Sequence, residues 1–244
     1  MRFYGLIGKT LKHSFSKSYF ESKFLKENIS DCVYSNFELD DLKELKSIVG
    51  DNRLSGFNVT IPYKEAIIPF LDSLSEEAKA IGAVNCVKVQ EGKLIGYNTD
   101  AFGFSSSLKP FIEPKHDKAL VLGTGGASKA VAYSLKKIGI EIFFASTKVQ
   151  NANSFLYKDV NEQMISAMKL IVNTTPLGMY PEVHSFPDIP YEFITSEHLC
   201  YDLIYNPEET VFLKRCKAQG AMVFNGLSML QLQAEKSWDI WQSS

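Results

Sequence analysis

A glycine-rich segment in the second half of the chain has the composition of a phosphate-binding turn. Gly123, Gly125 and Gly126 follow the apolar run LVL, and the small residues Ala127 and Ser128 open a helical pattern after them. Glycines let the backbone turn tightly and approach a pyrophosphate, whose charge the free N–H groups of a helix N-terminus stabilise. An ordinary strand-to-helix turn would share this pattern. The strand before it and the helix after it favour a dinucleotide site.

The end of the next predicted strand indicates which dinucleotide is bound. About 20 residues beyond the glycines, NAD-binding folds usually carry an Asp or Glu for the ribose 2′-hydroxyl. Here the strand ends with Ser146, Thr147 and Lys148, without a carboxylate. Two hydroxyls and an ammonium can hold a 2′-phosphate, which a carboxylate would repel. We therefore expect NADP, although the same residues could simply end a strand in solvent.

Polar residues also occur in the first hundred residues at places that hydrophobic periodicity does not predict. They are Ser14, Ser16, Asn58, Thr60, Lys64, Asn85 and Asp100. Taken singly, each fits a helix cap, a turn or a solvated surface. Lys64, however, begins a predicted helix after a proline, and Asp100 follows the end of a strand, so both can face one cleft. A positioned ammonium can supply a proton or a hydrogen bond to an oxygen on which negative charge develops.

Apolar spacing predicts that strands and helices alternate in both halves of the chain. In the first half, strands are expected at 3–8, 32–39, 55–62, 85–90 and 93–98, with helices at 16–28 and 40–50 and a broken helical run at 62–83, interrupted at Pro69. After a proline-containing connector at 108–118, strands are expected at 118–123, 141–147, 169–175, 199–205 and 221–226, with helices at 125–139 and 228–241.

This pattern predicts a two-domain α/β protein. Residues 1–100, completed by the C-terminal helix 227–244, form an α/β substrate-binding catalytic domain. Residues 101–226 form a Rossmann-type nucleotide domain with a doubly wound parallel sheet, and the active site lies in a cleft that closes on ligand.

Composition and charge exclude several classes of protein. The 244 residues carry a net charge of −2, and Lys and Arg are spread along the chain, so nucleic acid is not an expected partner. Four cysteines lie far apart without a C-x-x-C, and the histidines lack ligand spacing, so no metal is expected. No run approaches the roughly 18 apolar residues of a membrane span, and a cytoplasmic protein is expected.

Eight short motifs occur in the order that one known family shows. They are H-S-x-S-K-S, N-V-T-I-P-x-K-E, G-A-V-N, Y-N-T-D, G-x-G-G-A-S, N-T-T-P-L-G-M, Y-D-L-I-Y-x-P and N-G-L-x-M-L-x-x-Q-A, between His13 and Ala234. In this order the chain resembles the shikimate dehydrogenase family. The resemblance implies an oxidoreductase that reversibly reduces 3-dehydroshikimate to shikimate with NADPH, in chorismate and aromatic amino-acid biosynthesis.

The resemblance also implies roles for individual residues. The substrate carboxylate would be bound by Ser14 and Ser16, and the ring oxygens by Thr60, Lys64, Asn85, Asp100 and Gln233. Lys64 and Asp100 would form the catalytic pair, and Tyr205 would lie between cofactor and substrate. The cofactor would be held at its pyrophosphate by Gly123, Gly125, Gly126 and Ala127, at its adenosine ribose by Ser146, Thr147 and Lys148, and at its nicotinamide by Thr174, Leu203, Gly226 and Met229.

One departure from the family pattern leaves alternatives open. Ala145, Ser146 and Thr147 stand where the family commonly has Asn-Arg-Thr, so the bidentate phosphate contacts of an arginine are missing. A quinate/shikimate dehydrogenase with NAD or mixed cofactor use is one alternative. A non-catalytic shikimate-binding sensor and an enzyme for another small carbonyl compound are the others. A monomer and a homodimer are both compatible with the sequence.

Overall fold

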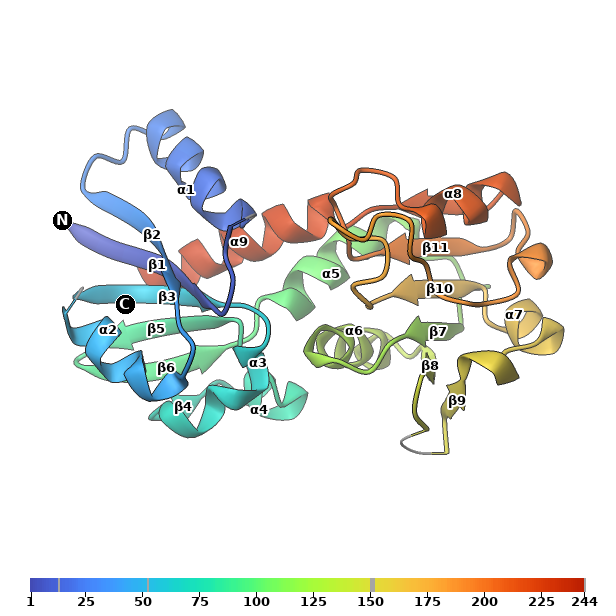
Figure 1. The fold of residues 1–244 in the computed structure, drawn as a ribbon, viewed down its shortest axis with the longest axis horizontal. Coiled ribbons are helices and arrows are strands. Elements are labelled where there is room, and N and C mark those ends of the chain that lie inside the picture. The colour runs from blue at the N-terminus through green and yellow to red at the C-terminus, as the bar shows by residue number, and fades with distance from the viewer. Residues whose placement is uncertain (13, 52, 150–151, 244) are drawn as a thin grey trace. The chain divides into compact units, whose positions relative to one another are not determined.

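The computed structural model describes residues 1–12, 14–51, 53–149 and 152–243. The chain folds into two compact units (Figure 1). The first comprises Met1–Thr99 with the segment from Ala234 onward, and the second is Asp100–Gln233. One boundary therefore lies between Thr99 and Asp100, and the other lies within the last helix.

The first unit is built on a mixed six-stranded sheet. Its strands are β1 (Arg2–Gly8), β2 (Cys32–Glu38), β3 (Leu54–Val59), β4 (Ser73–Leu74), β5 (Cys86–Gln90) and β6 (Lys93–Tyr97), in the order β2-β1-β3-β5-β6-β4. β1 is parallel to β2 and β3, whereas β5 is antiparallel to β3 and β6. Glu91 and Gly92 join β5 to β6 with positive φ at both residues, which confirms the expected hairpin.

The helices of this unit are short, apart from the first. They are α1 (Phe15–Lys26), η1 (Leu42–Glu44), α2 (Leu45–Asp51), α3 (Tyr63–Ala66), η2 (Ile68–Phe70) and α4 (Glu76–Ile81). The expected interruption at Pro69 is confirmed, because α3 ends at Ala66 and the proline lies in η2. The short strand β4, which lies within the run expected to be helical, was not predicted.

The second unit contains a fully parallel six-stranded sheet. Its strands are β7 (Lys118–Leu122), β8 (Glu141–Ser146), β9 (Ser154–Leu156), β10 (Leu170–Asn173), β11 (Leu199–Asp202) and β12 (Met222–Phe224), in the order β12-β11-β10-β7-β8-β9. The order reverses on either side of β7, which is the arrangement of a doubly wound dinucleotide-binding fold. The sequence predicted every strand of this sheet except β9.

Helices of the second unit cover both faces of its sheet. They are α5 (Asp100–Leu108), η3 (Lys109–Phe111), α6 (Gly126–Lys137), η4 (Tyr157–Asp159), α7 (Glu162–Ala167), η5 (Tyr191–Phe193), α8 (Val211–Ala218) and the first part of α9 (Leu227–Gln242). Alternate residues of β7 belong to different cores. Leu120 and Leu122 pack with Phe212 of α8, whereas Ala119 and Val121 pack with Val131 of α6. Because β7 is buried on both faces, nearly all of its residues are apolar, and this continuous apolar run predicted the strand.

The C-terminal part of α9 packs onto the first unit through aromatic side chains. Trp241 stacks on Tyr4 of β1 with ring centroids 4.8 Å apart, and its indole N–H donates to the carbonyl of Val87 in β5 at 3.0 Å. A Cβ on Gly56 of β3 would lie 2.4 Å from the indole, so that strand position requires glycine. The last turns of α9 are therefore an integral layer of this unit.

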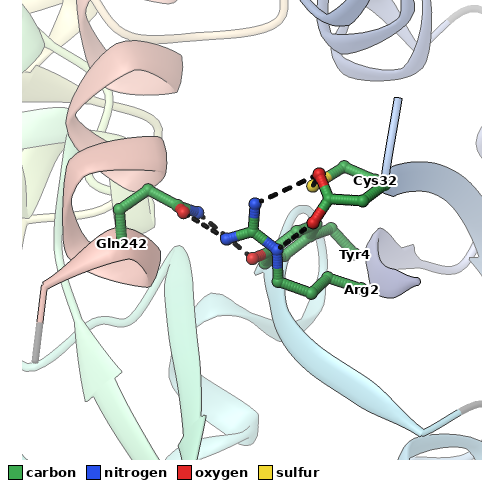
Figure 2. A network of polar contacts seen from close by, with 5 residues as sticks. Arg2, Tyr4, Cys32 and Gln242 are labelled. Carbon is green, nitrogen blue, oxygen red and sulfur yellow. Dashed lines mark hydrogen bonds and ion pairs between the residues drawn. The ribbon is translucent and has the colours of Figure 1, made fainter. Parts of the chain in front are cut away.

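Polar contacts tie the same end of α9 to the first strand (Figure 2). The Arg2 guanidinium lies between the Gln242 amide and the segment at Cys32, where it forms an ion pair with Asp31. The Gln242 amide also donates to the Tyr4 hydroxyl at 3.1 Å. Burial raises the pKa of Tyr4, so its phenol stays protonated at neutral pH. Among the described residues, no helix is long and apolar enough to cross a membrane.

Replacing Trp241 tests how much α9 contributes to the first unit. We expect Trp241→Ala to lower the free energy of unfolding by about 3 kcal/mol or more, because truncating a buried aromatic ring leaves a cavity. Trp241→Phe keeps a ring but loses the bond to Val87, and should cost about 1 kcal/mol. Chemical denaturation measures both values. Equal stability of the alanine variant and the unaltered protein would contradict this assignment.

Candidate active site

The glycine turn connects β7 to α6 and leaves the N-terminus of that helix open. Gly123 has φ +98, and a Cβ there would lie 2.9 Å from Thr175, so the turn requires glycine at this point. Gly125 is the N-cap of α6 and has no side chain to cap it; a Cβ there would meet open space. No acidic residue occurs in the first turn of α6. The positive end of the helix dipole is thus available to an anion beside Gly126 and Ala127.

The end of β8 lies next to this turn in the sheet. Gly123 donates its N–H to the carbonyl of Ala145 at 2.8 Å, which places Ser146 beside the glycines. The Ser146 hydroxyl is buried and bonds both the N–H and the carbonyl of Lys148, so it closes a tight turn. Thr147 and Lys148 are exposed at the tip of that turn. The side chains available to a ribose phosphate here are therefore the Thr147 hydroxyl and the Lys148 ammonium.

The ends of β10, β11 and β12 follow along the same edge of the sheet. Thr174 donates both its N–H and its hydroxyl to the carbonyl of Leu122, at 2.9 and 2.7 Å. Leu203 donates its N–H to the carbonyl of Asn173 at 3.0 Å. A Cβ on Gly226 would lie 2.0 Å from the Leu203 carbonyl oxygen, which makes glycine obligatory there. The structure thus brings the predicted nicotinamide residues Thr174, Leu203 and Gly226 together with the glycine turn.

The remaining predicted residues of the second unit lie on or near α5 and α9. A Cβ on Gly103 would lie 2.6 Å from the carbonyl oxygen of Met229 and 3.0 Å from Cβ of Gln233, so α5 and α9 are in close contact there. Asp100 is buried and lies one turn earlier on α5. Tyr205 is half-buried beyond β11, and burial raises the pKa of its phenol. Asp100 is thus one helical turn from the contact that holds Gln233.

In the first unit, the predicted carboxylate-binding residues lie at the start of α1. Ser14 is the N-cap of α1, yet its side chain makes no capping hydrogen bond, and its hydroxyl is shielded from solvent without a partner among the residues that the structure describes. Ser16 lies in the first turn, which carries no acidic residue. A buried hydroxyl without a partner is costly, and an anion at the helix N-terminus would satisfy it. His13, which opens this motif, is outside the described residues.

Lys64 and Asn85 are connected through the backbone of one short segment. The Lys64 carbonyl accepts from the N–H of Val84 at 2.7 Å. The Asn85 side-chain oxygen accepts from the N–H of Thr99 at 2.6 Å, and its nitrogen donates to the Thr99 hydroxyl at 3.0 Å. Thr60 lies at the end of β3, where its N–H donates to the carbonyl of Ile7 at 2.9 Å. Lys64 itself is half-buried on α3.

The boundary between the two units divides the predicted site. Ser14, Ser16, Thr60, Lys64 and Asn85 belong to the first unit, and Asp100, Tyr205, Gln233 and all the predicted cofactor residues belong to the second. Asp100 nevertheless follows Thr99 directly in the chain. Asn85 therefore fixes Thr99, the residue that directly precedes Asp100.

Asp202 is a buried carboxylate of the second unit. It lies in the motif Y-D-L-I-Y-x-P, but the sequence assigned it no role. Asp202 accepts from the Thr210 hydroxyl at 2.6 Å, the N–H of Ile204 at 3.0 Å and the Asn173 side-chain nitrogen at 3.1 Å. The Asn173 oxygen in turn accepts from the N–H of Thr175 at 3.0 Å. This cluster holds the loops after β10 and β11, which carry Thr174 and Leu203. An acid at the end of an otherwise apolar strand was the signal that could have identified it.

Burial dominates the electrostatics of Asp202. It raises the pKa of the carboxyl from 3.8 to about 6, against the opposing effect of the three donors. Within the described part of the chain, no group of three or more His, Cys, Asp or Glu side chains is arranged to hold a metal ion.

The fold and the glycine turn define the second unit as a dinucleotide-binding domain of the Rossmann type, attached to a smaller α/β unit. Residues 6–87 match the family model described as the shikimate dehydrogenase substrate binding domain. Over 250 residues the chain is 42% identical to the shikimate dehydrogenase (NADP(+)) of Aquifex aeolicus, with 98% of this chain and 90% of the relative covered.

Solved structures lead to the same family. Shikimate dehydrogenase 1 from Peptoclostridium difficile is 40% identical, with a TM-score of 0.87 over 99% of this chain and 92% of that one. Shikimate 5-dehydrogenase from Thermus thermophilus, solved with NADP(H) and shikimate, is 33% identical, with a TM-score of 0.87 over 99% of this chain and 94% of that one. The chain belongs to the shikimate dehydrogenase family.

The pH dependence of stability tests the Asp202 cluster. Because the folded-state pKa is raised, protonated Asp202 stabilises the fold below about pH 4, and this contribution is lost as the pH rises through about 6. The shift from 3.8 to about 6 corresponds to about 3 kcal/mol. We expect the stability of the unaltered protein, relative to Asp202→Asn, to fall by up to that amount between pH 4 and 7. Parallel stability curves for the two proteins would contradict the shift.

Proposed function

We propose that this chain catalyses the reversible NADP-dependent reduction of 3-dehydroshikimate to shikimate. Lys64 and Asp100 form its catalytic pair. The observation that carries the proposal is the convergence on residues 84 and 85: the backbone of Lys64 bonds to Val84, while Asn85 holds Thr99, the residue before Asp100. The backbone of Lys64 and the residue before Asp100 are thus bonded to two adjacent residues of the chain.

The substrate that we propose has a carboxylate at one end and ring oxygens at the other, and the polar groups of the first unit suit both ends. Ser14, whose hydroxyl has no partner within the described part of the chain, and Ser16 lie at the positive end of α1 and would bind the carboxylate. The Asn85 oxygen is occupied by the Thr99 N–H, so the Asn85 nitrogen is the group that can donate toward a ring oxygen. Thr60, Asp100, Tyr205 and Gln233 would complete the contacts, as the family pattern implies.

The residues of the second unit fit a dinucleotide phosphate. Gly123, Gly125, Gly126 and Ala127 would hold the pyrophosphate, because the α6 N-terminus carries neither a capping side chain nor an acid. Ser146 shapes the turn that presents Thr147 and Lys148 to a 2′-phosphate. Thr174, Leu203, Gly226 and Met229 would hold the nicotinamide end. When bound, NADPH supplies a hydride to the ketone carbon.

Lys64 then serves the oxygen of the same carbonyl group. As negative charge develops on that oxygen, the ammonium donates a hydrogen bond and transfers a proton, which yields the hydroxyl of shikimate. Asp100 is buried; in this scheme its side chain orients the ammonium. In the reverse direction the neutral amine accepts the hydroxyl proton.

Replacing the proposed proton donor tests the mechanism. Lys64→Met should lower kcat by about 100-fold or more, which is typical for loss of a general acid, and should change the KM for shikimate less. Lys79→Met, which removes an exposed ammonium from α4, is the matched control and should keep normal turnover. Steady-state absorbance at the nicotinamide band measures both. Near-normal turnover by Lys64→Met would remove this residue from the mechanism.

Cofactor choice is tested by comparing NADP with NAD in the oxidation of shikimate. We expect a higher kcat/KM with NADP, and we expect Lys148→Glu to reduce the NADP-to-NAD ratio about tenfold or more by replacing an attractive charge with a repulsive one. Lys136→Glu makes the same charge change at the far end of α6 and should preserve the ratio. Comparable use of both cofactors, together with turnover of quinate, would instead establish a quinate/shikimate dehydrogenase.

A further inference from the structure

A chain of buried polar side chains crosses the first unit and links both ends of the proposed substrate site. Its members are Tyr34, Asn58, Ser237, Thr99 and Asn85, each at most 5% exposed. They lie on four different parts of the fold: β2, β3, α9 and the two ends of the β5–β6 hairpin. We call this set the polar relay. Neither the residue patterns nor the family resemblance assigned a role to Tyr34, Thr99 or Ser237.

Hydrogen-bond chemistry fixes the orientation of both amides in the relay. The Asn58 side-chain nitrogen lies 3.2 Å from the carbonyl oxygen of Asn85, which can only accept, so this atom must be the donor nitrogen. The Asn58 oxygen therefore accepts from the Tyr34 hydroxyl, at 2.9 Å. Likewise, the Thr99 N–H can only donate, so the atom 2.6 Å from it is the Asn85 oxygen. Neither amide can rotate without losing these bonds.

Ser237 connects the two amides. Its hydroxyl oxygen accepts from the second N–H of Asn58 at 2.9 Å and lies 3.2 Å from the Thr99 hydroxyl, in a hydrogen bond in which either oxygen can be the donor. The Thr99 hydroxyl also accepts from the Asn85 nitrogen at 3.0 Å. Ser237 is fully buried, so water cannot replace its bonds if the hydroxyl is removed.

The relay reaches the carboxylate end of the site through Tyr34. Burial raises the pKa of the Tyr34 phenol well above its ordinary value, and a hydrogen bond with Ser16 opposes that rise. Tyr34 is held flat against Phe20 of α1, with ring centroids 4.5 Å apart and an interplanar angle of 15°. The helix that carries Ser14 and Ser16 is therefore packed on the same tyrosine whose hydroxyl orients Asn58.

We infer that Ser237 is a positioning residue for substrate binding: through Thr99 it fixes Asn85 and the start of α5 at Asp100, and through Asn58 and Tyr34 it holds these groups in register with Ser16. The C-terminal helix thus supplies the central member of a scaffold that sets the distance between the two ends of the substrate site. This inference rests on the proposed function for its substrate.

The test compares three variants that each remove one buried hydroxyl. Ser237→Ala should raise the KM for shikimate about tenfold, since one buried hydrogen-bonded link is lost, and should leave the KM for NADP within about twofold. Tyr34→Phe keeps the ring and removes the hydroxyl at the far end of the relay; it should raise the same KM about threefold or more. Ser107→Ala is the matched control, because its buried hydroxyl bonds the Phe104 carbonyl and the Tyr201 hydroxyl in the second unit.

Measuring the KM for shikimate and the Tm of each variant separates a positioning role of Ser237 from a merely structural one. If Ser237→Ala and Ser107→Ala lower the Tm alike and both keep the KM for shikimate within twofold of normal, the inference is overturned. If Ser237→Ala does not fold, Tyr34→Phe decides: a normal KM for shikimate in that variant also overturns it.

A readout without substrate separates this inference from the proposed function. Hydrogen exchange of the Asn85 side-chain amide, followed by NMR, should accelerate about tenfold or more in Ser237→Ala and remain unchanged in Ser107→Ala. Absence of shikimate turnover in the unaltered protein would refute the proposed function alone, because the exchange measurement then still tests the relay. Unchanged Asn85 exchange in Ser237→Ala would refute the relay whatever the activity.

Discussion

The pairing of Asn85 with Thr99 is the constraint on which the proposed chemistry depends. Two hydrogen bonds, of 2.6 and 3.0 Å, join the residues that flank the β5–β6 hairpin. They determine where the chain leaves the first unit and therefore where Asp100 begins α5. Because Val84 also bonds the carbonyl of Lys64, the same short segment fixes the backbone that carries the proposed proton donor.

The second unit uses a comparable device around Asp202. A carboxylate shielded from water at the end of β11 collects donors from Asn173, Ile204 and Thr210. Buried polar groups with all their partners in place are rigid, since each alternative conformation leaves a group unsatisfied. Each unit has one such cluster: Asn85 and Thr99 flank the β5–β6 hairpin, and Asp202 ends β11. The neighbouring segments carry residues proposed to bind ligand. Loops without a hydrophobic core of their own gain order in this way.

In the proposed site, cofactor recognition rests on backbone geometry more than on charged side chains. The open N-terminus of α6 and the glycines that leave it uncovered provide donors for a pyrophosphate without any arginine. At the end of β8, Ser146 uses its hydroxyl to close the turn, so Lys148 supplies the only cationic side chain among residues 144–149. This division explains how the chain can depart from the family's Asn-Arg-Thr pattern and keep the shape of the site.

Apolar periodicity and glycine positions are local signals, and from them the sequence predicted the α/β alternation, the glycine turn, the hairpin and the parallel strands of the second unit except β9. It did not predict β4 or β9, because strands of two and three residues are too short to show apolar periodicity. The equally short β12 was predicted because it lies in the continuous apolar run 221–224. The polar relay, by contrast, depends on contacts between distant parts of the chain. Asn58 and Ser237 are 179 positions apart in the chain, and no spacing rule links a serine on a late helix to an asparagine on an early strand. Their bond exists because the last turns of α9 pack against the first sheet through Trp241, which brings both groups into a region that excludes water.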